Sequence, residues 1–125
     1  MLGNIDASAN LAVRDLAIAR KFYEGTLGLT PVDSEGDELV AYRSGNTVLY
    51  VYESAEAGTN KATAVTWVVG DDIEEVVQSL KAKGVTFGHY DLPDTVRSGD
   101  VHVTGDMKVA WFKDPSGNIL NLASR

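Results

Sequence analysis

Few side chains in this chain could carry out acid–base or metal chemistry, because it has no cysteine and only two histidines, His89 and His102. An imidazole titrates near neutral pH and can serve as a general acid, a general base or a metal ligand. His102 lies in a long polar segment, residues 91–106, with no carboxylate or nucleophile at a catalytic spacing. We therefore expect His102 on an exposed loop, with an acid–base role as the alternative, and His89 at the surface.

Carboxylates occur close together at Asp37-Glu38 and at residues 71–75. A turn and the acidic start of a helix explain these pairs, because the helix dipole favours negative charge at that end. A metal site built from the two histidines and either Asp100 or Asp106 is conceivable, but no spacing pattern supports it. The chain also contains neither a Gly-rich phosphate loop nor a Gly-x-Ser-x-Gly motif.

Amide and aromatic side chains are the other candidates for ligand contacts. Asn121 alternates with apolar neighbours, and its amide could bond a ligand or be a satisfied structural amide. Tyr50 and Tyr52 share one strand face, where they could stack on a ligand, pack as a wall or form a dimer contact. Trp111 could face a ligand or the core, whereas the pattern around Trp67 favours the core. The candidate ligand-binding residues, including two small polar residues of the first strand, are Ser8, Asn10, Tyr50, Tyr52, His102, Trp111 and Asn121.

The composition limits the partners of the chain. Its net charge is −7 and its pI is about 4.6, so we expect neither nucleic-acid nor membrane binding, because phosphates would be repelled. This acidity would favour a cationic ligand. The chain has no apolar run of about 18 residues and no leader pattern, so we expect no transmembrane segment and no signal peptide. With no cysteine present, a cytoplasmic location is expected.

The first half of the chain predicts a strand, a helix and three further strands. Residues 5–13 alternate, with Ser8 and Asn10 opposite the apolar face. Asp15 can cap a helix whose apolar residues recur at helical spacing to Leu27, and Gly28 follows as a left-handed C-cap. The next strands are predicted at residues 30–33, 38–43 and 47–53, and the small polar residues 54–60 predict a linker.

The second half repeats this order. A strand at residues 62–69 precedes a helix that begins at Asp72, with Glu75 placed as in a capping box and Gly84 after its end. A strand at residues 85–90 and a long polar segment with a short strand at 101–104 follow. The last two strands, 108–113 and 119–123, flank a Pro-Ser-Gly-Asn turn that is typical of a β-hairpin.

This order indicates an internal duplication of a strand–helix–strand–strand–strand module. We predict a single domain, residues 1–125, with module one at 1–55, a linker at about 54–61 and module two at 62–125. One module cannot bury both faces of its sheet, so two modules would form an α+β fold with a curved mixed sheet of roughly eight strands. The helices would cover the convex face and leave a concave cleft for a ligand.

The helices and the last hairpin also resemble those of a known family. The motif Asp15-Leu16-x-x-Ala19-x-x-Phe22-Tyr23-x-x-x-Leu27-Gly28-Leu29 resembles the first helix of the vicinal oxygen chelate superfamily. That superfamily includes glyoxalase I, extradiol dioxygenases, fosfomycin-resistance proteins and bleomycin-binding proteins. Asp72-Ile73 with Leu80-Lys81-Ala82-Lys83-Gly84-Val85 resembles its second helix, and Trp111-Phe112-Lys113-Asp114-Pro115-x-Gly117-Asn118 resembles its closing hairpin. The resemblance covers nearly the whole chain and implies two βαβββ modules, paired within one chain or across a homodimer, which we expect here.

The resemblance also implies where a metal would bind. Metal enzymes of this superfamily use inward-pointing His or Glu ligands, one from each of four strands. The matching positions of this chain are Ser8, Tyr50, Ala64 or Val65, and Asn121. Because divalent metals of this kind prefer carboxylate and imidazole donors, we predict no metal at this place, and no cofactor.

Two functional hypotheses follow. The first is a metal-free protein that binds or sequesters a small apolar or cationic ligand in the concave cleft, similar in architecture to bleomycin-binding proteins. The alternative is a glyoxalase-like lyase or isomerase, or a dioxygenase, that works without a metal or with an unusual metal site. In that case His102, Tyr50 or Asn121 would act on the substrate. An interaction module with a collapsed cleft is the third hypothesis.

Overall fold

The computed structural model describes residues 1–35 and 38–125, so Asp37 of the predicted Asp37-Glu38 turn lies outside the described residues. The chain divides into two compact units. Unit one comprises Met1–Lys61 with Asp114–Asn118, and unit two comprises Ala62–Lys113 with Ile119–Arg125. The single-domain assignment stays a prediction. No helix of the described residues has the length and apolarity that a membrane span requires.

Unit one contains a four-stranded sheet in the order β1-β4-β3-β2. Its elements are β1 (Ala9–Val13), α1 (Leu16–Arg20), the π-helix η1 (Lys21–Thr26), β2 (Thr30–Glu35), β3 (Leu39–Ser44) and β4 (Thr47–Glu53). Alternation places Leu11, Leu49 and Val51 on one face of the sheet, where they are buried. The apolar side of the helix, which includes Leu16 and Ala19, is buried as well, and α1 contacts β4.

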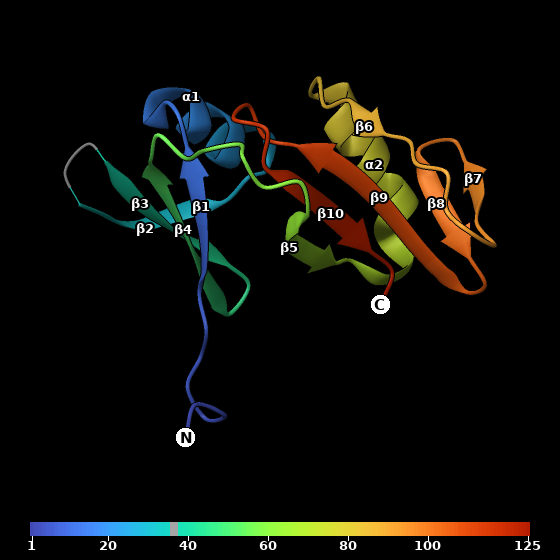
Figure 1. Cartoon of the computed structure of the whole chain (residues 1–125), viewed down its shortest axis with the longest axis horizontal. Coiled ribbons are helices and arrows are strands. Elements are labelled where there is room, and N and C mark those ends of the chain that lie inside the picture. The colour runs from blue at the N-terminus through green and yellow to red at the C-terminus, as the bar shows by residue number, and fades with distance from the viewer. Residues whose placement is uncertain (36–37) are drawn as a thin grey trace. The chain divides into compact units, whose positions relative to one another are not determined.

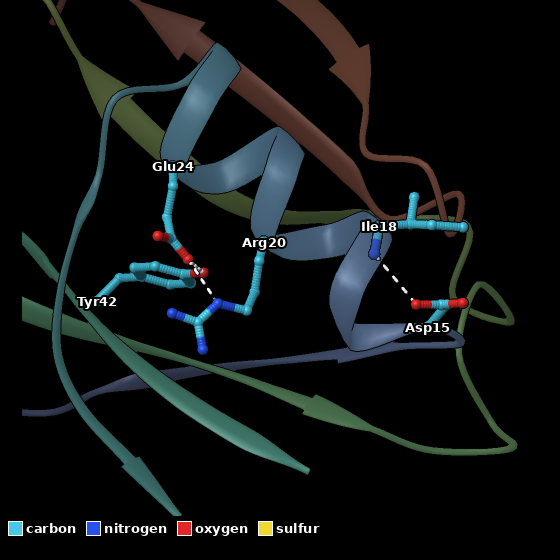
Figure 2. A network of polar contacts seen from close by, with 5 residues as sticks. All are labelled: Asp15, Ile18, Arg20, Glu24 and Tyr42. Carbon is cyan, nitrogen blue, oxygen red and sulfur yellow. Dashed lines mark hydrogen bonds and ion pairs between the residues drawn. The ribbon is translucent and has the colours of Figure 1, made fainter. Parts of the chain in front are cut away.

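The first helix begins as predicted and ends differently. The Asp15 carboxylate accepts a hydrogen bond from the Ile18 backbone N–H at 3.1 Å, which confirms the N-cap (Figure 2). The predicted α-helix to Leu27 is wrong beyond Arg20, because the chain widens there into a π-helix. The Leu27 N–H then bonds the Phe22 carbonyl five residues earlier. Gly28 ends the helix with a positive φ of 76°, as predicted.

Unit two contains a six-stranded sheet in the order β5-β10-β9-β8-β7, with β6 paired to β9. Its elements are β5 (Thr63–Val68), the 3-10 helix η2 (Gly70–Asp72), α2 (Ile73–Ala82), β6 (Phe87–Gly88), β7 (Val96–Ser98), β8 (Val101–Thr104), β9 (Met107–Lys113) and β10 (Ile119–Ala123). The register places β6 and β8 end to end along the edge of β9 that β10 leaves open. Helix α2 contacts β9, and Figure 1 shows it behind that strand.

The strand orders confirm the two-module α+β fold. The arrangement β1-β4-β3-β2 of unit one recurs in unit two as β5-β10-β9-β6. The hairpin β7–β8 is the extra part of the second module, and it occupies the long polar segment 91–106. The pairing differs from the prediction in one respect, because the described residues form two sheets rather than one.

Several predicted boundaries are corrected. The first strand begins at Ala9, so Ser8 lies before it, and the strand predicted at 85–90 is reduced to Phe87–Gly88. The strand β7 was not predicted at all. The side chain of Asp72 makes no capping hydrogen bond, because η2 runs directly into α2 and leaves Asp72 in a near-helical conformation with ψ at 6°. The capping box predicted there is therefore wrong.

A buried polar network holds the β9–β10 loop in unit one. The Asp114 carboxylate accepts hydrogen bonds from the Tyr23 hydroxyl at 2.7 Å and the Asn118 amide at 2.8 Å. It also accepts hydrogen bonds from the backbone N–H groups of Ser116 at 3.0 Å and Asn118 at 2.9 Å. The side-chain amide of Asn118 also donates a hydrogen bond to the Ala12 carbonyl of β1 at 2.7 Å. The loop is thus a structural component of unit one as well as a turn between two strands.

A second polar network lies beside the helix of unit one (Figure 2). The Tyr42 hydroxyl donates to the Glu24 carboxylate at 2.7 Å, and the Arg20 guanidinium donates to the same oxygen at 2.8 Å. Burial, reinforced by the Glu24 hydrogen bond, raises the pKa of Tyr42. Burial and the neighbouring Asp114 raise the pKa of Tyr23 still further. These groups hold the helix on the sheet.

Candidate functional site

One face of the unit-two sheet brings together three of the predicted ligand-binding residues. Asn121 on β10 pairs with Trp111 on β9, and His102 on β8 pairs with Val109, two residues from Trp111 on the same face. The opposite face carries the buried residues Phe112 and Leu120. The rings of His102 and Trp111 are in edge contact, with their centroids 4.9 Å apart. We call the set His102, Trp111 and Asn121 the polar–aromatic face.

His102 is buried, which makes the predicted loop position wrong. It lies on β8 and only 2% of its surface is exposed, because Tyr90 and Trp111 pack against its ring. Its Nε2 atom accepts a hydrogen bond from the Tyr90 backbone N–H at 3.0 Å. A ring nitrogen that accepts carries no hydrogen, so the ring hydrogen is placed on Nδ1. That Nδ1–H is buried and has no partner among the described residues.

Asn121 has an unpaired hydrogen-bond acceptor, whereas His102 has an unpaired donor. Its side chain is half-buried between Trp111 on β9 and Thr66 on β5. The Oδ1 atom of its amide is buried and accepts no hydrogen bond. Among the side chains that the structure describes, His102 Nδ1 and Asn121 Oδ1 are the only buried polar atoms without a partner. Most buried polar atoms in proteins are paired, so two exceptions on the same face suggest a common cause.

A pocket of about 400 Å³ lies beside His102. It is lined by His89, Tyr90, Asp91, Leu92, Thr95, Arg97 and His102. The Tyr90 ring contacts Trp111 with centroids 5.2 Å apart, which joins the pocket to the polar–aromatic face. Tyr90 follows β6 and His102 lies on β8, so the pocket forms where these two strands meet along the edge of β9.

The charges near the pocket are partly neutralised. The Asp100 carboxylate forms hydrogen bonds with Lys81 and His89, each at 2.7 Å. These bonds lower the pKa of Asp100, and the bond from Lys81 has the larger effect. The hydrogen bond to Asp100 occupies the Nε2 atom of His89, which is otherwise exposed as predicted. Arg97 and Asp91 line the pocket without an ion pair to any described residue. Arg97 lies directly opposite His102 in the β7–β8 hairpin.

The remaining candidates lie in unit one. Asn10 on β1 pairs with Tyr50 on β4, and Ala12 pairs with Tyr52, so both tyrosines share a face with Asn10 as predicted. Tyr50 and Tyr52 are half-buried and Asn10 is exposed. Ser8 is exposed and precedes β1. A ligand role for these residues stays a prediction.

The two tryptophans lie on different faces of the unit-two sheet. Trp67 pairs with Leu122, whose side chain is buried, and so belongs to the face opposite Trp111. This register is the one expected for a core residue. Trp111 shares its face with His102, and its indole N–H donates to the Thr63 hydroxyl at 3.2 Å. The two indoles can therefore report on the two faces separately.

The donor chemistry does not fit the metal that the family implies. In unit two the residue beside Asn121 is Thr66, whereas Val65 pairs with Leu120 on the other face and Ala64 lies at a register irregularity. Neither a hydroxyl nor an amide replaces the carboxylate and imidazole donors that such metals prefer. Among the described residues no group of three or more His, Cys, Asp or Glu could hold a metal ion. Of the conceivable site at the histidines, Asp100 does bond His89, but the His102 Nε2 atom is occupied by the Tyr90 N–H and Asp106 pairs with Arg125.

Sequence reasoning missed Tyr90, Leu92 and Arg97. Nothing in the local sequence shows that Tyr90 meets His102, because β6 and β8 become neighbours only through their common pairing with β9. The one available indication was the unusual length of segment 91–106 in the second module. Long insertions in a compact domain are often functional.

The sheet order, the duplicated modules and a polar–aromatic strand face define a small protein of the glyoxalase type. A sequence profile of the Glyoxalase/Bleomycin resistance protein/Dioxygenase superfamily matches residues 5–122, and the chain belongs to this superfamily. The family resemblance seen in the sequence is thereby confirmed. No curated protein sequence matches the chain significantly.

Solved structures show the same fold. Lactoylglutathione lyase from Agrobacterium tumefaciens has a TM-score of 0.72 at 18% identity, over 98% of this chain and 95% of that chain. The fosfomycin resistance protein FosX from Mesorhizobium loti has a TM-score of 0.71 at 12% identity, over 100% and 94%. An integron cassette protein from the Halifax Harbour sewage outfall metagenome has a TM-score of 0.72 at 17% identity, over 94% and 96%. At such low identity these likenesses show the fold alone.

Proposed function

We propose that this protein binds a small, partly apolar organic ligand without a metal, on the polar–aromatic face of unit two. The observation that carries the proposal is the pair of buried, unpartnered atoms, His102 Nδ1 and Asn121 Oδ1, on either side of Trp111. Leaving a buried polar atom unpaired costs about 1–3 kcal/mol. A ligand with an acceptor at one end and a donor at the other would remove both costs.

The surroundings suit such a ligand. The indole of Trp111 and the ring of Tyr90 offer flat apolar surfaces, which stack well on a ring or an alkyl chain. The pocket volume of about 400 Å³ lies within the range of ligand pockets. An apolar or cationic ligand in a concave cleft was expected from the sequence, and that cleft and the homodimer stay predictions. Binding or sequestration is the role we propose, and the unpartnered atoms of His102 and Asn121 are its support.

The two indole N–H groups allow a direct test. The chain has only two tryptophans, so an isotope-labelled sample gives two indole signals in a proton–nitrogen NMR spectrum, which Trp111→Phe assigns. A fragment screen should yield compounds that shift the Trp111 signal and leave the Trp67 signal in place. The proposal fails if every compound that binds moves Trp67 or neither indole. Stoichiometric divalent metal in the purified protein would contradict the metal-free part.

A metal-independent lyase or isomerase is the second candidate, favoured by one observation. A buried imidazole with one nitrogen held by the Tyr90 N–H and the other free is suitably placed to transfer a proton. Compounds that shift Trp111 should be incubated with the protein and followed by NMR over hours. If the protein converts one of these compounds and the variant His102→Gln does not, the protein is an enzyme and the binding proposal is wrong.

A further inference from the structure

The pocket beside His102 contains the cation Arg97, and its wall includes the His102 ring, whose buried Nδ1 atom has no partner among the described residues. We infer that it binds the carboxylate of a small organic acid, held by Arg97 and by His102 Nδ1–H, with the apolar body of the acid against Tyr90 and Leu92. This inference rests on the proposed function and specifies its ligand. Arg97 and His102 lie on the β7–β8 hairpin, the part of unit two that has no counterpart in unit one, and the other lining residues precede it.

The register of the hairpin brings the two carboxylate-binding groups together. Arg97 and His102 are directly opposite on antiparallel strands, so their side chains point to the same face with Cβ atoms about 4.5–5.5 Å apart. Arg97 makes no ion pair with a described residue, and a guanidinium stays charged at every physiological pH. His102 Nδ1–H is the only buried side-chain donor of the described residues that lacks an acceptor. A carboxylate oxygen is the acceptor that both groups favour.

The apolar wall and the remaining charge limit the ligand further. Tyr90 is 42% exposed and Leu92 is 41% exposed, although both line the pocket, so they offer uncovered apolar surface. Asp91 also lines the pocket and would repel a second negative charge on the ligand. Asp100 adds little repulsion because Lys81 forms an ion pair with it and His89 is hydrogen-bonded to it. The expected ligand is therefore a monoanion with a ring or short alkyl body, in contrast to the cationic ligand that the net charge favours.

Three probes of equal shape and different charge test the inference, namely benzoate, benzamide and benzamidine. Each is titrated into the full chain up to millimolar concentration, with the Trp111 and Trp67 indole signals as the readout. Benzoate should bind most tightly, and added salt should weaken it. Arg97→Gln should weaken benzoate about tenfold or more and leave benzamide unchanged, because the substitution removes a charge-assisted hydrogen bond.

Two control variants sharpen the result. Arg43→Gln removes an exposed arginine of β3 in unit one and should change nothing. Asp91→Asn should strengthen benzoate and weaken benzamidine, which a general loss of structure would not do. If benzamide or benzamidine binds more tightly than benzoate through Trp111, the inference is overturned and the proposed function stands. If none of the three shifts Trp111, the carboxylate site is refuted, and the fragment screen decides the proposed function separately.

Discussion

Replacing Tyr23 with phenylalanine should show how much stability the Asp114 network contributes. The Asp114 side chain is 4% exposed, and its carboxylate accepts hydrogen bonds from the Tyr23 hydroxyl, the Asn118 amide and two backbone N–H groups. Tyr23 is fully buried and bonds Asp114 at 2.7 Å. The substitution removes one hydroxyl and preserves the ring, which packs against Tyr42.

The size of the effect follows from the charge of the acceptor. A hydrogen bond to a charged group contributes about 1.5–3 kcal/mol, so Tyr23→Phe should lower the free energy of unfolding by about 2 kcal/mol. Asp114→Asn should cost more, about 3–5 kcal/mol. Both carboxylate oxygens of Asp114 accept hydrogen bonds, so the NH2 group of an asparagine would point at hydrogen-bond donors in either orientation of the amide. Both losses are large against a typical total of about 5–15 kcal/mol.

Urea unfolding followed by circular dichroism at neutral pH measures these differences. The double variant is included, because two residues in contact should give less than the sum of the single effects. Tyr52→Phe serves as the matched control, since Tyr52 lies half-buried on the other face of the sheet. A loss below about 0.5 kcal/mol for Tyr23→Phe would refute the reasoning, because it would mean that the hydrogen bond is replaced by water at no cost.

Three further predictions concern pH, packing and the site. Because the pKa values of Tyr23 and Tyr42 are raised, the folded chain keeps protons that the unfolded chain loses near pH 10. The free energy of unfolding should thus be unaffected below about pH 10 and fall above it, less steeply in Tyr23→Phe, as urea midpoints would show. Gly58→Ala should cost about 3 kcal/mol or more in urea unfolding, because φ is +75° and the new Cβ would overlap a carbonyl of the β9–β10 loop. Gly45→Ala, at φ +59° in open space, should cost only about 1–2 kcal/mol. Asn121→Leu should leave stability equal or higher and abolish the ligand-induced shift of the Trp111 indole, and a clear loss of stability would show that its Oδ1 has a partner.

Much of the fold could be predicted because it follows local patterns. The alternation of residues 47–53 and 119–123 gave the bounds of β4 and β10, and the cap at Asp15 was found from its side-chain chemistry. The missed elements are those whose sequence lacks a clear period. The three residues of β7 are all exposed, so they show no apolar alternation, and the π-helix depends on a shift in hydrogen bonding that spacing does not reveal.

The candidate site was predicted in part. Asn121 and Trp111 were selected from parity and chemistry, and the structure places them side by side on one sheet face. His102 was selected for its imidazole, but its burial was missed. A histidine in a polar segment is buried only if other parts of the chain cover it, and Tyr90 and Trp111 do so after β6, β8 and β9 have paired. Arg97 drew no attention, because its position opposite His102 exists only in the hairpin.

The sequence by itself determined the order of the elements, their duplication and the superfamily, since caps, turns and apolar periods act over a few residues. It also determined which side chains occupy the four positions that match the superfamily's metal ligands, and none of these side chains is a carboxylate or an imidazole. The tertiary structure alone decided which polar groups are paired. Asp114 meets Tyr23 across 91 positions of the chain, whereas His102 Nδ1 and Asn121 Oδ1 meet no partner. Burial and pairing depend on contacts between distant segments, and only the folded chain brings those segments together.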